Sequence, residues 1–290
     1  MSDETGRGGF DAGWLDLRAG FDHAARVPAL ERRLAAMLRR RPGNQLTIVD
    51  LGAGTGGGLL HLAPCLTRWL SPGIHQSWRL VERDPALIAA GQTRLATLPA
   101  VVAGDLRVTY QPADLALEDL SGLIADADLV HFTALIDLAG MDWLVRLADA
   151  VAARGVPMLG ALTFDGRMDW SPPADGDDAA VAGFIHHQRR DKGLGGVALG
   201  ADAAPALARL LTDRGMAVRL VASDWVIGPE DTAMHAAMVD GVAGALEDLA
   251  ADGLVPAGQP AAFRSARDAA SPGRLVVGHL DLLAWRRGRE

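Results

Sequence analysis

The chain has 290 residues, of which 49% are apolar and 22% charged, and its formal net charge is −8. These values are typical of a globular protein and exclude a chain that is disordered throughout. The acidic balance argues against a nucleic acid as partner, and no apolar stretch approaches the roughly eighteen residues of a membrane span. A single cysteine, Cys65, excludes an intrachain disulfide and a cysteine-based metal cluster.

The chain begins with polar and acidic residues, without the basic and then apolar segments of a signal peptide. We therefore expect a cytoplasmic protein. A helical pattern then covers residues 10–41, with Pro28 where a first helical turn tolerates proline.

Strands and helices are predicted to alternate through the first half of the chain. Apolar runs predict five strands, at residues 46–51, 78–82, 106–110, 128–133 and 156–164. Helical patterns lie between them, at residues 59–70, 85–98 and 141–153. This alternation predicts an α/β fold with a doubly wound, mostly parallel sheet.

The alternation lapses after residue 164. Residues 165–178 are rich in Asp, Pro and Gly and predict an irregular segment. The remaining predicted elements are helices at 179–190, 202–214 and 231–251 and strands at 216–225 and 275–285. We therefore expect seven strands, an N-terminal helical lid at residues 1–44, and a main domain at 45–290 with helical cap insertions at about 165–200 and 226–272.

A glycine-rich segment, Asp-Leu-Gly-Ala-Gly-Thr-Gly at residues 50–56, follows the first predicted strand and precedes a helix. The glycines permit a tight turn and close approach of a ligand to a helix N-terminus. Gly52, Gly54 and Gly57 also satisfy the spacing of dinucleotide-binding loops, so an NAD(P)-dependent oxidoreductase is the alternative interpretation. Asp50 argues against it, because a carboxylate there repels a pyrophosphate but can hold an ammonium group.

This segment resembles the first motif of class I S-adenosylmethionine-dependent methyltransferases. Residues 80–84, 110–115 and 128–134 resemble later motifs of that family in the same order. The resemblance covers residues 46–164 and implies a Rossmann-like methyltransferase fold. It also implies S-adenosyl-L-methionine as cofactor and S-adenosyl-L-homocysteine as product. Residues 165–200 resemble an uncharacterised bacterial small-molecule subgroup.

The resemblance also implies roles for residues at the strand ends. Glu82 is placed to hold the ribose hydroxyls, Asp114 to meet the adenine amine, and Thr133 to lie near the methyl group. The alternatives are that Asp50 caps its turn, that Asp114 caps a helix, and that Thr133 is small for tight packing. The predicted cofactor site is completed by neighbouring motif positions, namely Gly52, Ala53, Gly54, Gly56, Arg83, Leu115 and Ala134.

The acceptor site is harder to predict, because methyl transfer needs a base only if the acceptor must lose a proton. Asp137, one turn after the fourth strand, is a candidate catalytic residue or else a helix cap. His187 and Arg189 are candidates for proton transfer and anion binding, or else part of a solvated helix end. The candidate substrate-binding residues are Asp165, Arg167, Trp170, His187, Arg189 and Lys192, the only lysine of the chain.

The N-terminal helical segment contains Arg18, Phe21, Asp22 and Arg26. Either it covers the pocket, with Arg18 meeting the cofactor carboxylate, or these are surface charges. The predicted function is methylation of a small-molecule acceptor that is anionic or contains a ring. The other alternative is a regulatory protein that binds the cofactor without catalysis. We expect no metal, nucleic acid or membrane partner, and either a monomer or a homodimer.

Overall fold

The computed structural model describes residues 12–97, 106–270 and 273–288. The strands are β1 (Gln45–Leu51), β2 (His75–Glu82), β3 (Leu106–Pro112), β4 (Leu129–Thr133), β5 (Met158–Ser171), β6 (Met216–Ala222), β7 (Trp225–Ile227) and β8 (Arg274–Arg286). The longer helices are α1 (Ala12–Ala25), α2 (Pro28–Leu38), α3 (Gly57–Trp69), α4 (Pro85–Leu95), α7 (Met141–Arg154), α8 (Asp177–Gln188), α9 (Ala203–Asp213), α10 (Thr232–Ala251) and α11 (Gln259–Ala270). Three shorter turns are α6 (Leu120–Leu123), η1 (Ile136–Leu138) and η2 (Gly200–Asp202).

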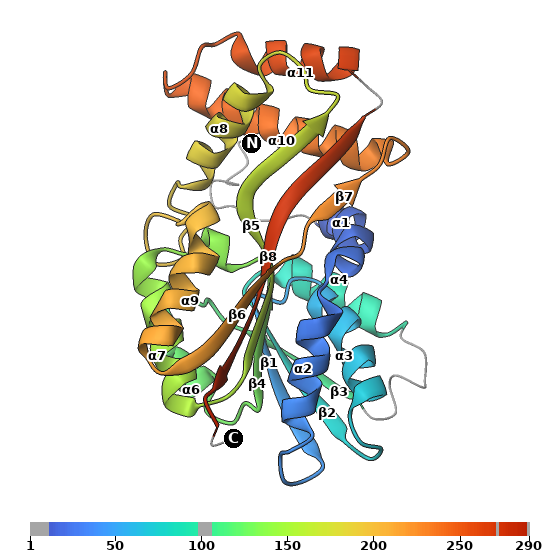
Figure 1. The fold of residues 1–290 in the computed structure, drawn as a ribbon, viewed down its shortest axis with the longest axis vertical. Helices are drawn as coiled ribbons and strands as arrows, with labels where there is room; N and C mark the ends of the chain where they lie inside the picture. The colour runs from blue at the N-terminus through green and yellow to red at the C-terminus, as the bar shows by residue number, and fades with distance from the viewer. Residues whose placement is uncertain (1–11, 98–105, 271–272, 289–290) are drawn as a thin grey trace.

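All eight strands form one sheet in the order β3-β2-β1-β4-β5-β8-β6, with β7 also paired to β8 (Figure 1). Strands β1 to β5 pair in parallel, whereas β8 runs antiparallel to β5, β6 and β7. The predicted doubly wound, mostly parallel α/β sheet is therefore confirmed. The strand predicted at 216–225 is interrupted at Ser223 and Asp224, and its last part becomes the short β7.

Helices cover both faces of the parallel part of the sheet, which explains the continuous apolar sequences of its strands. One face packs on α2 and α3, where Leu34, Leu62 and Trp78 are fully buried. The opposite face packs on α6, α7 and α9, around Phe132 and Trp143. Among the described residues, no helix combines the length and apolarity needed to span a membrane.

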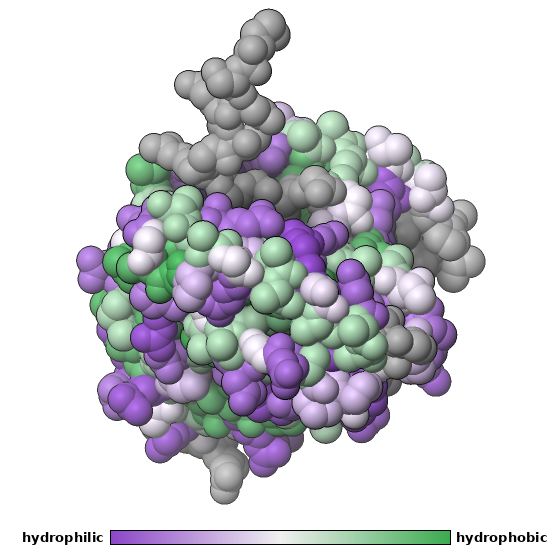
Figure 2. Space-filling view, turned by 90° about the horizontal axis from the view of Figure 1, so that it is seen from above, coloured by the Kyte–Doolittle hydropathy of each residue, from purple (hydrophilic) through white to green (hydrophobic). Residues whose placement is uncertain are grey.

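The ends of β5 and β8 extend beyond the other strands and carry a third hydrophobic core with α8, α10 and α11 (Figure 1). Hydrophilic and hydrophobic side chains are interspersed over the end of the molecule seen in Figure 2. The prediction of an irregular segment directly after residue 164 was wrong, because β5 continues to Ser171. Pairing with β8 overrides the loop-like composition, and Gly166, at φ 93°, lies in the bulge between Phe164 and Met168.

The predicted N-terminal helical region divides at Pro28, which begins α2. Leu30 and Leu34 of α2 belong to the sheet core, whereas α1 packs Leu17 and Phe21 against the third core. Only α1 lies over the carboxyl ends of the parallel strands. Sequence reasoning did not predict α11. Residues 1–11 of the predicted lid, residue 98 of a predicted helix, residues 271–272 of the second predicted insertion and residues 289–290 lie outside the described residues.

Candidate functional site

A cavity of about 910 Å³ lies at the carboxyl ends of β1 to β4, beneath α1. Open α/β sheets bind ligands at this edge. Gly56, the N-cap of α3, lies behind the glycine loop and does not line the cavity. The cavity is lined by the other predicted cofactor residues, namely Arg18, Asp50, Gly52, Ala53, Gly54, Glu82, Arg83, Asp114, Leu115, Thr133 and Ala134.

The glycine loop has a backbone that only glycine adopts readily. Gly52 and Gly54 have φ values of 63° and 55°. A Cβ atom on Gly52 would meet the side chain of Leu135 at 2.8 Å. The glycines therefore keep side chains off the loop where it lines the cavity.

Glu82, at the end of β2, holds this loop in place. Its Oε2 accepts a hydrogen bond from the Gly54 N–H at 2.9 Å. Its Oε1 accepts from the N–H groups of Arg83 and Asp84 at 2.8 and 3.0 Å. Each carboxylate oxygen has two acceptor positions, so one position, on Oε2, remains for a ligand hydroxyl.

Asp114, at the end of β3, has two neighbours. Its Oδ1 accepts from the Ala116 N–H at 3.0 Å, and its Oδ2 lies 3.5 Å from Arg83 Nη1. The interpretation of Asp114 as a cap therefore accounts for one of its two carboxylate oxygens. The other oxygen is paired across the outer part of the cavity.

Asp50, at the end of β1, is 1% exposed. The Nδ1–H of His131 donates to its Oδ1 at 2.8 Å, while its Oδ2 is buried and has no hydrogen-bond partner among the described residues. The His131 ring lies edge-on to Trp78 within the core. Because Asp50 lines the cavity, its free oxygen is available to a hydrogen-bond donor on a ligand.

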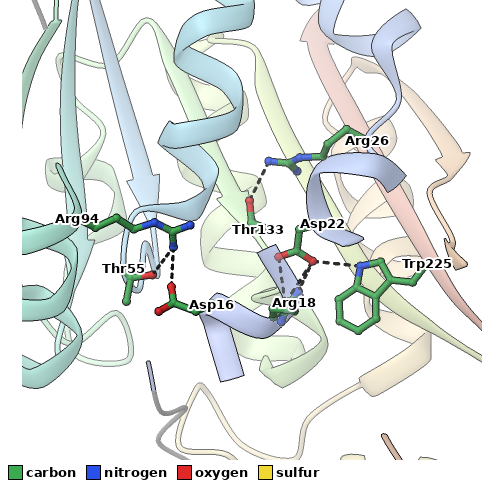
Figure 3. Close-up of polar contacts among 8 residues, drawn as sticks. All are labelled: Asp16, Arg18, Asp22, Arg26, Thr55, Arg94, Thr133 and Trp225. Carbon is green, nitrogen blue, oxygen red and sulfur yellow. Dashed lines mark hydrogen bonds and ion pairs between the residues drawn. The ribbon is translucent and has the colours of Figure 1, made fainter. Parts of the chain in front are cut away.

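Arg26 directly follows α1 and is 7% exposed. Its Nη2 donates to Thr133 Oγ1 at 3.3 Å, but its Nε and Nη1 are buried without a partner (Figure 3). A buried guanidinium with two free N–H groups is costly unless an acceptor arrives. Sequence reasoning placed Arg26 only in the N-terminal segment and gave the role of binding a carboxylate to Arg18.

Arg18, unlike Arg26, has partners for its guanidinium group within the protein. Its guanidinium donates to Asp22 at 3.0 Å and stacks on Trp225 at 4.9 Å from the ring centroid. Asp22 also accepts from the Trp225 indole N–H at 3.1 Å (Figure 3). Arg18 therefore anchors the middle of α1 to β7, although it also lines the cavity.

The N-terminal half of α1 is held at a second point. The guanidinium of Arg94, on α4, donates to Asp16 at 3.2 Å and to Thr55 Oγ1 at 3.5 Å (Figure 3). Together with Arg18 and Arg26, this contact fixes α1 across the cavity. The interpretation in which the N-terminal segment covers the pocket thus applies to α1.

The side of the cavity beyond β4 carries the candidate acceptor groups. Ala134 has a φ of 49°, a conformation uncommon for a residue with a side chain. Lys192 lines the cavity, and burial lowers the pKa of its ammonium group. Asp137 lies in η1 with a buried, unpartnered Oδ1, and burial raises its pKa to about 6.

Apart from Lys192, the candidate acceptor residues, Asp137 included, do not line this cavity. His187 pairs with Asp248 at 2.9 Å, and Arg189 with Asp202 at 2.5 Å. Arg167 bridges Asp165 and Asp224, each at 2.7 Å. Trp170 instead lines a second cavity of about 280 Å³, between β5, α10 and α11. The roles of these residues stay predictions.

Sequence reasoning missed two histidines of the cavity wall, His23 on α1 and His61 on α3. It also missed Leu138 and Gln188. No sequence signal identifies them, since they come from elements that only the fold brings together.

The sequence matches no protein-family model and no curated protein. Its fold is similar to that of a protein from Galdieria sulphuraria assigned as a sarcosine dimethylglycine methyltransferase, with 17% identity, TM-score 0.41, and 89% of this chain and 84% of that chain covered. It is also similar to a geranyl diphosphate methyltransferase solved with GPP and sinefungin, with 14% identity, TM-score 0.41, and coverage of 90% and 78%. A third is human N-acetylserotonin methyltransferase solved with SAM, with 12% identity, TM-score 0.38, and coverage of 70% and 48%. At such TM-scores these likenesses carry no functional inference.

Proposed function

We propose that this chain is an S-adenosylmethionine-dependent methyltransferase that acts on a small molecule. One observation carries the proposal: Asp50 Oδ2 and the Nε and Nη1 of Arg26 are buried without partners on the wall of one cavity. The first is an acceptor for an ammonium group, and the others are donors for a carboxylate. An α-amino acid end, such as the methionyl part of the cofactor, supplies both groups.

The remaining cofactor contacts follow from the strand ends. Glu82 would accept from a ribose hydroxyl with the one acceptor position that its three backbone bonds leave on Oε2. Asp114 and Leu115 would border the adenine, and Thr133 and Ala134 would lie beside the sulfonium. When bound, the cofactor supplies a methyl group on a positively charged sulfur.

The acceptor would occupy the side of the cavity beyond β4. Leu138 and Gln188 provide apolar and polar surface there, and Lys192 provides a cation for an anionic acceptor. Asp137, in η1, does not line the cavity. A direct role of His187 or Arg189 in catalysis would require α8 or its end to move, because both are paired outside the cavity.

The oxidoreductase alternative places a pyrophosphate beside the glycine loop. It would leave the free oxygen of Asp50 facing a second negative group. A regulatory protein that binds the cofactor without turnover would use the same residues, so only an assay of methyl transfer separates it from the enzyme. Both a monomer and a homodimer are compatible with the proposal.

Calorimetric titration tests the proposal directly. We expect S-adenosylhomocysteine to bind with micromolar affinity. We expect 5′-methylthioadenosine, which lacks the amino acid end, to bind at least tenfold more weakly. NADH should show no binding. Binding of NADH alone would overturn the proposal.

A further inference from the structure

Helices α1, α2 and α3 bring a chain of hydrogen bonds to the cavity wall. Nε2 of His61 lies 2.6 Å from Oε1 of Glu31, and Nδ1 of His61 lies 2.8 Å from Nδ1 of His23. Both histidines line the cavity, whereas Glu31 is 4% exposed at the far end of the chain. The order from the core outward is therefore Glu31, His61, His23.

The Glu31 carboxylate determines where the protons of this chain lie. An ionised carboxylate only accepts, so Nε2 of His61 carries a proton and donates it. Nδ1 of a neutral His61 then holds a lone pair and accepts, which makes Nδ1 of His23 the donor. The atom left with a free lone pair is Nε2 of His23. This is the logic by which a buried carboxylate orients a catalytic histidine.

His23 also lies near the place where transfer would occur. It lies in the last turn of α1, and Arg26 directly follows that helix and also lines the cavity. The Arg26 guanidinium reaches Thr133 at 3.3 Å, at the carboxyl end of β4. The proposed function places the methyl group at that strand end, and the end of α1 lies above it.

We propose that Nε2 of His23 is the general base that takes a proton from the methyl acceptor, and that His61 and Glu31 are positioning residues. This inference rests on the proposed function and narrows the acceptor to hydroxyl, thiol or N–H compounds. As the acceptor atom bonds to the methyl carbon, the carbon–sulfur bond breaks and its electron pair stays on sulfur. The acceptor proton passes to His23 Nε2 and then to water.

The charges around His23 suit a base at neutral pH. Partial burial lowers the pKa of His23, and the neighbouring Arg26 guanidinium acts in the same direction against the opposing charge of Glu31. Cys65, one turn after His61 on α3, borders Glu31 from the other side. Burial raises the pKa of Cys65, which keeps it a neutral thiol. These are the titratable and charged groups that face His23 from α1, α2 and α3.

The first test reads the proton positions by long-range ¹H–¹⁵N NMR of histidine side chains in the whole chain. We expect wild-type His23 to carry its proton on Nδ1, the less populated tautomer of free histidine. His61→Phe should return His23 to the ordinary Nε2–H tautomer, and His186→Gln on α8 should leave it unchanged. A wild-type His23 protonated on Nε2 at neutral pH would overturn the relay.

The second test measures methyl transfer from labelled S-adenosylmethionine to a panel of phenols, thiols and anilines between pH 5 and 9. We expect His23→Gln to lower kcat by about 10²- to 10⁴-fold and to remove the acid limb of the pH profile. S-adenosylhomocysteine affinity should stay within twofold, which keeps this test separate from the proposed function. Wild-type kcat and pH profile in His23→Gln, or no transfer to any panel member, would overturn the inference.

Zinc is the competing occupant of this cluster. Glu31, His61 and Cys65 offer ligand atoms that lie within 4.8 Å of one another, and zinc accepts all three ligand types. We expect micromolar zinc neither to bind nor to alter the histidine NMR signals. Stoichiometric zinc binding that Cys65→Ser abolishes would overturn the relay.

Discussion

Two polar regions of this molecule differ in how their charges are satisfied. In the segment from Asp165 to Asp202, the predicted site residues Asp165, Arg167, His187 and Arg189 take part in ion pairs, mostly at the surface. Arg167 bridges two aspartates, Arg189 pairs with Asp202, and His187 with Asp248. At the cavity wall, Asp50 and Arg26 are buried and keep free polar atoms.

The difference shows that a high density of charged residues is a weaker indicator of a ligand site than a buried polar atom that lacks a hydrogen-bond partner. A solvated ion pair at a surface contributes little to stability, typically about 0–1 kcal/mol, and needs no ligand. A buried polar atom without a partner costs about 1–3 kcal/mol until something binds it.

Arg26→Met removes the free guanidinium of the cavity. We expect S-adenosylhomocysteine affinity to fall by about 10- to 150-fold, the range for losing a hydrogen bond to a charged group of about 1.5–3 kcal/mol. Binding of 5′-methylthioadenosine should not change, because that ligand has no carboxylate. Calorimetry with both ligands measures this. An equal loss for the two ligands would contradict the assignment of Arg26 to the carboxylate.

Asp50→Asn keeps an oxygen for the His131 N–H but removes the negative charge. We expect S-adenosylhomocysteine to bind about tenfold more weakly or worse, since a charge-assisted bond to its ammonium group is lost. 5′-Methylthioadenosine again serves as the matched ligand and should bind as before. Unchanged affinity for S-adenosylhomocysteine would remove the central support for the proposed function.

Glu82→Gln should weaken both ligands by a similar factor of about ten, because the ribose is common to them. The amide also has one acceptor oxygen in place of two, so the N–H groups of Gly54, Arg83 and Asp84 compete for it. Calorimetry measures the loss of ligand affinity, and thermal unfolding measures the effect of the lost backbone hydrogen bonds on stability. Selective loss of S-adenosylhomocysteine alone would show that Glu82 does not face the ribose.

Asp137→Asn tests how a buried carboxyl group makes the free energy of unfolding depend on pH. Burial raises the folded-state pKa of Asp137 to about 6, so its contribution to stability is present below pH 4 and is lost as pH rises through 6. We expect the variant to exceed the wild type by roughly 1–3 kcal/mol at pH 8 and to match it at pH 4. Urea unfolding at both pH values measures this. The exposed Asp213→Asn is the control, and an equal pH trend there would contradict the prediction.

Arg189→Met should have the smallest effect. The side chains of Arg189 and Asp202 are 51% and 64% exposed, so we expect a change in unfolding free energy within about 0.5 kcal/mol. Affinity for S-adenosylhomocysteine should equal that of the wild type. A tenfold loss of affinity would mean that the surface region contributes to the cofactor site after all.

The sequence predicted the parallel half of the fold well, because its strands are short segments with buried apolar residues that alternate with helical patterns. The prediction from sequence failed where pairing between distant strands decided the structure. Asp165 and Gly166 have loop-like composition, yet β8 draws this segment into β5. It also failed for α11, whose polar sequence after Pro256 lacks a strong apolar stripe.

The cofactor half of the candidate site could be read from local motifs, since one loop and three strand ends provide most of its residues. The acceptor half could not. His23, Glu31 and His61 come from three helices whose relative positions depend on packing against the sheet. Their polar side chains are spaced as on any solvated helix. They indicate a site only when their hydrogen-bond partners are known.

By itself, the sequence determined which strands are buried, where the chain turns tightly, and which carboxylates lie at strand ends. These properties depend on residues close in the chain. The tertiary structure alone decided which polar groups are satisfied. Arg18 and Arg26 look alike in sequence, but packing gives one Asp22 and Trp225 as partners and leaves the other with free N–H groups in a cavity. Burial and partner choice are non-local, and they distinguish a structural charge from one that awaits a ligand.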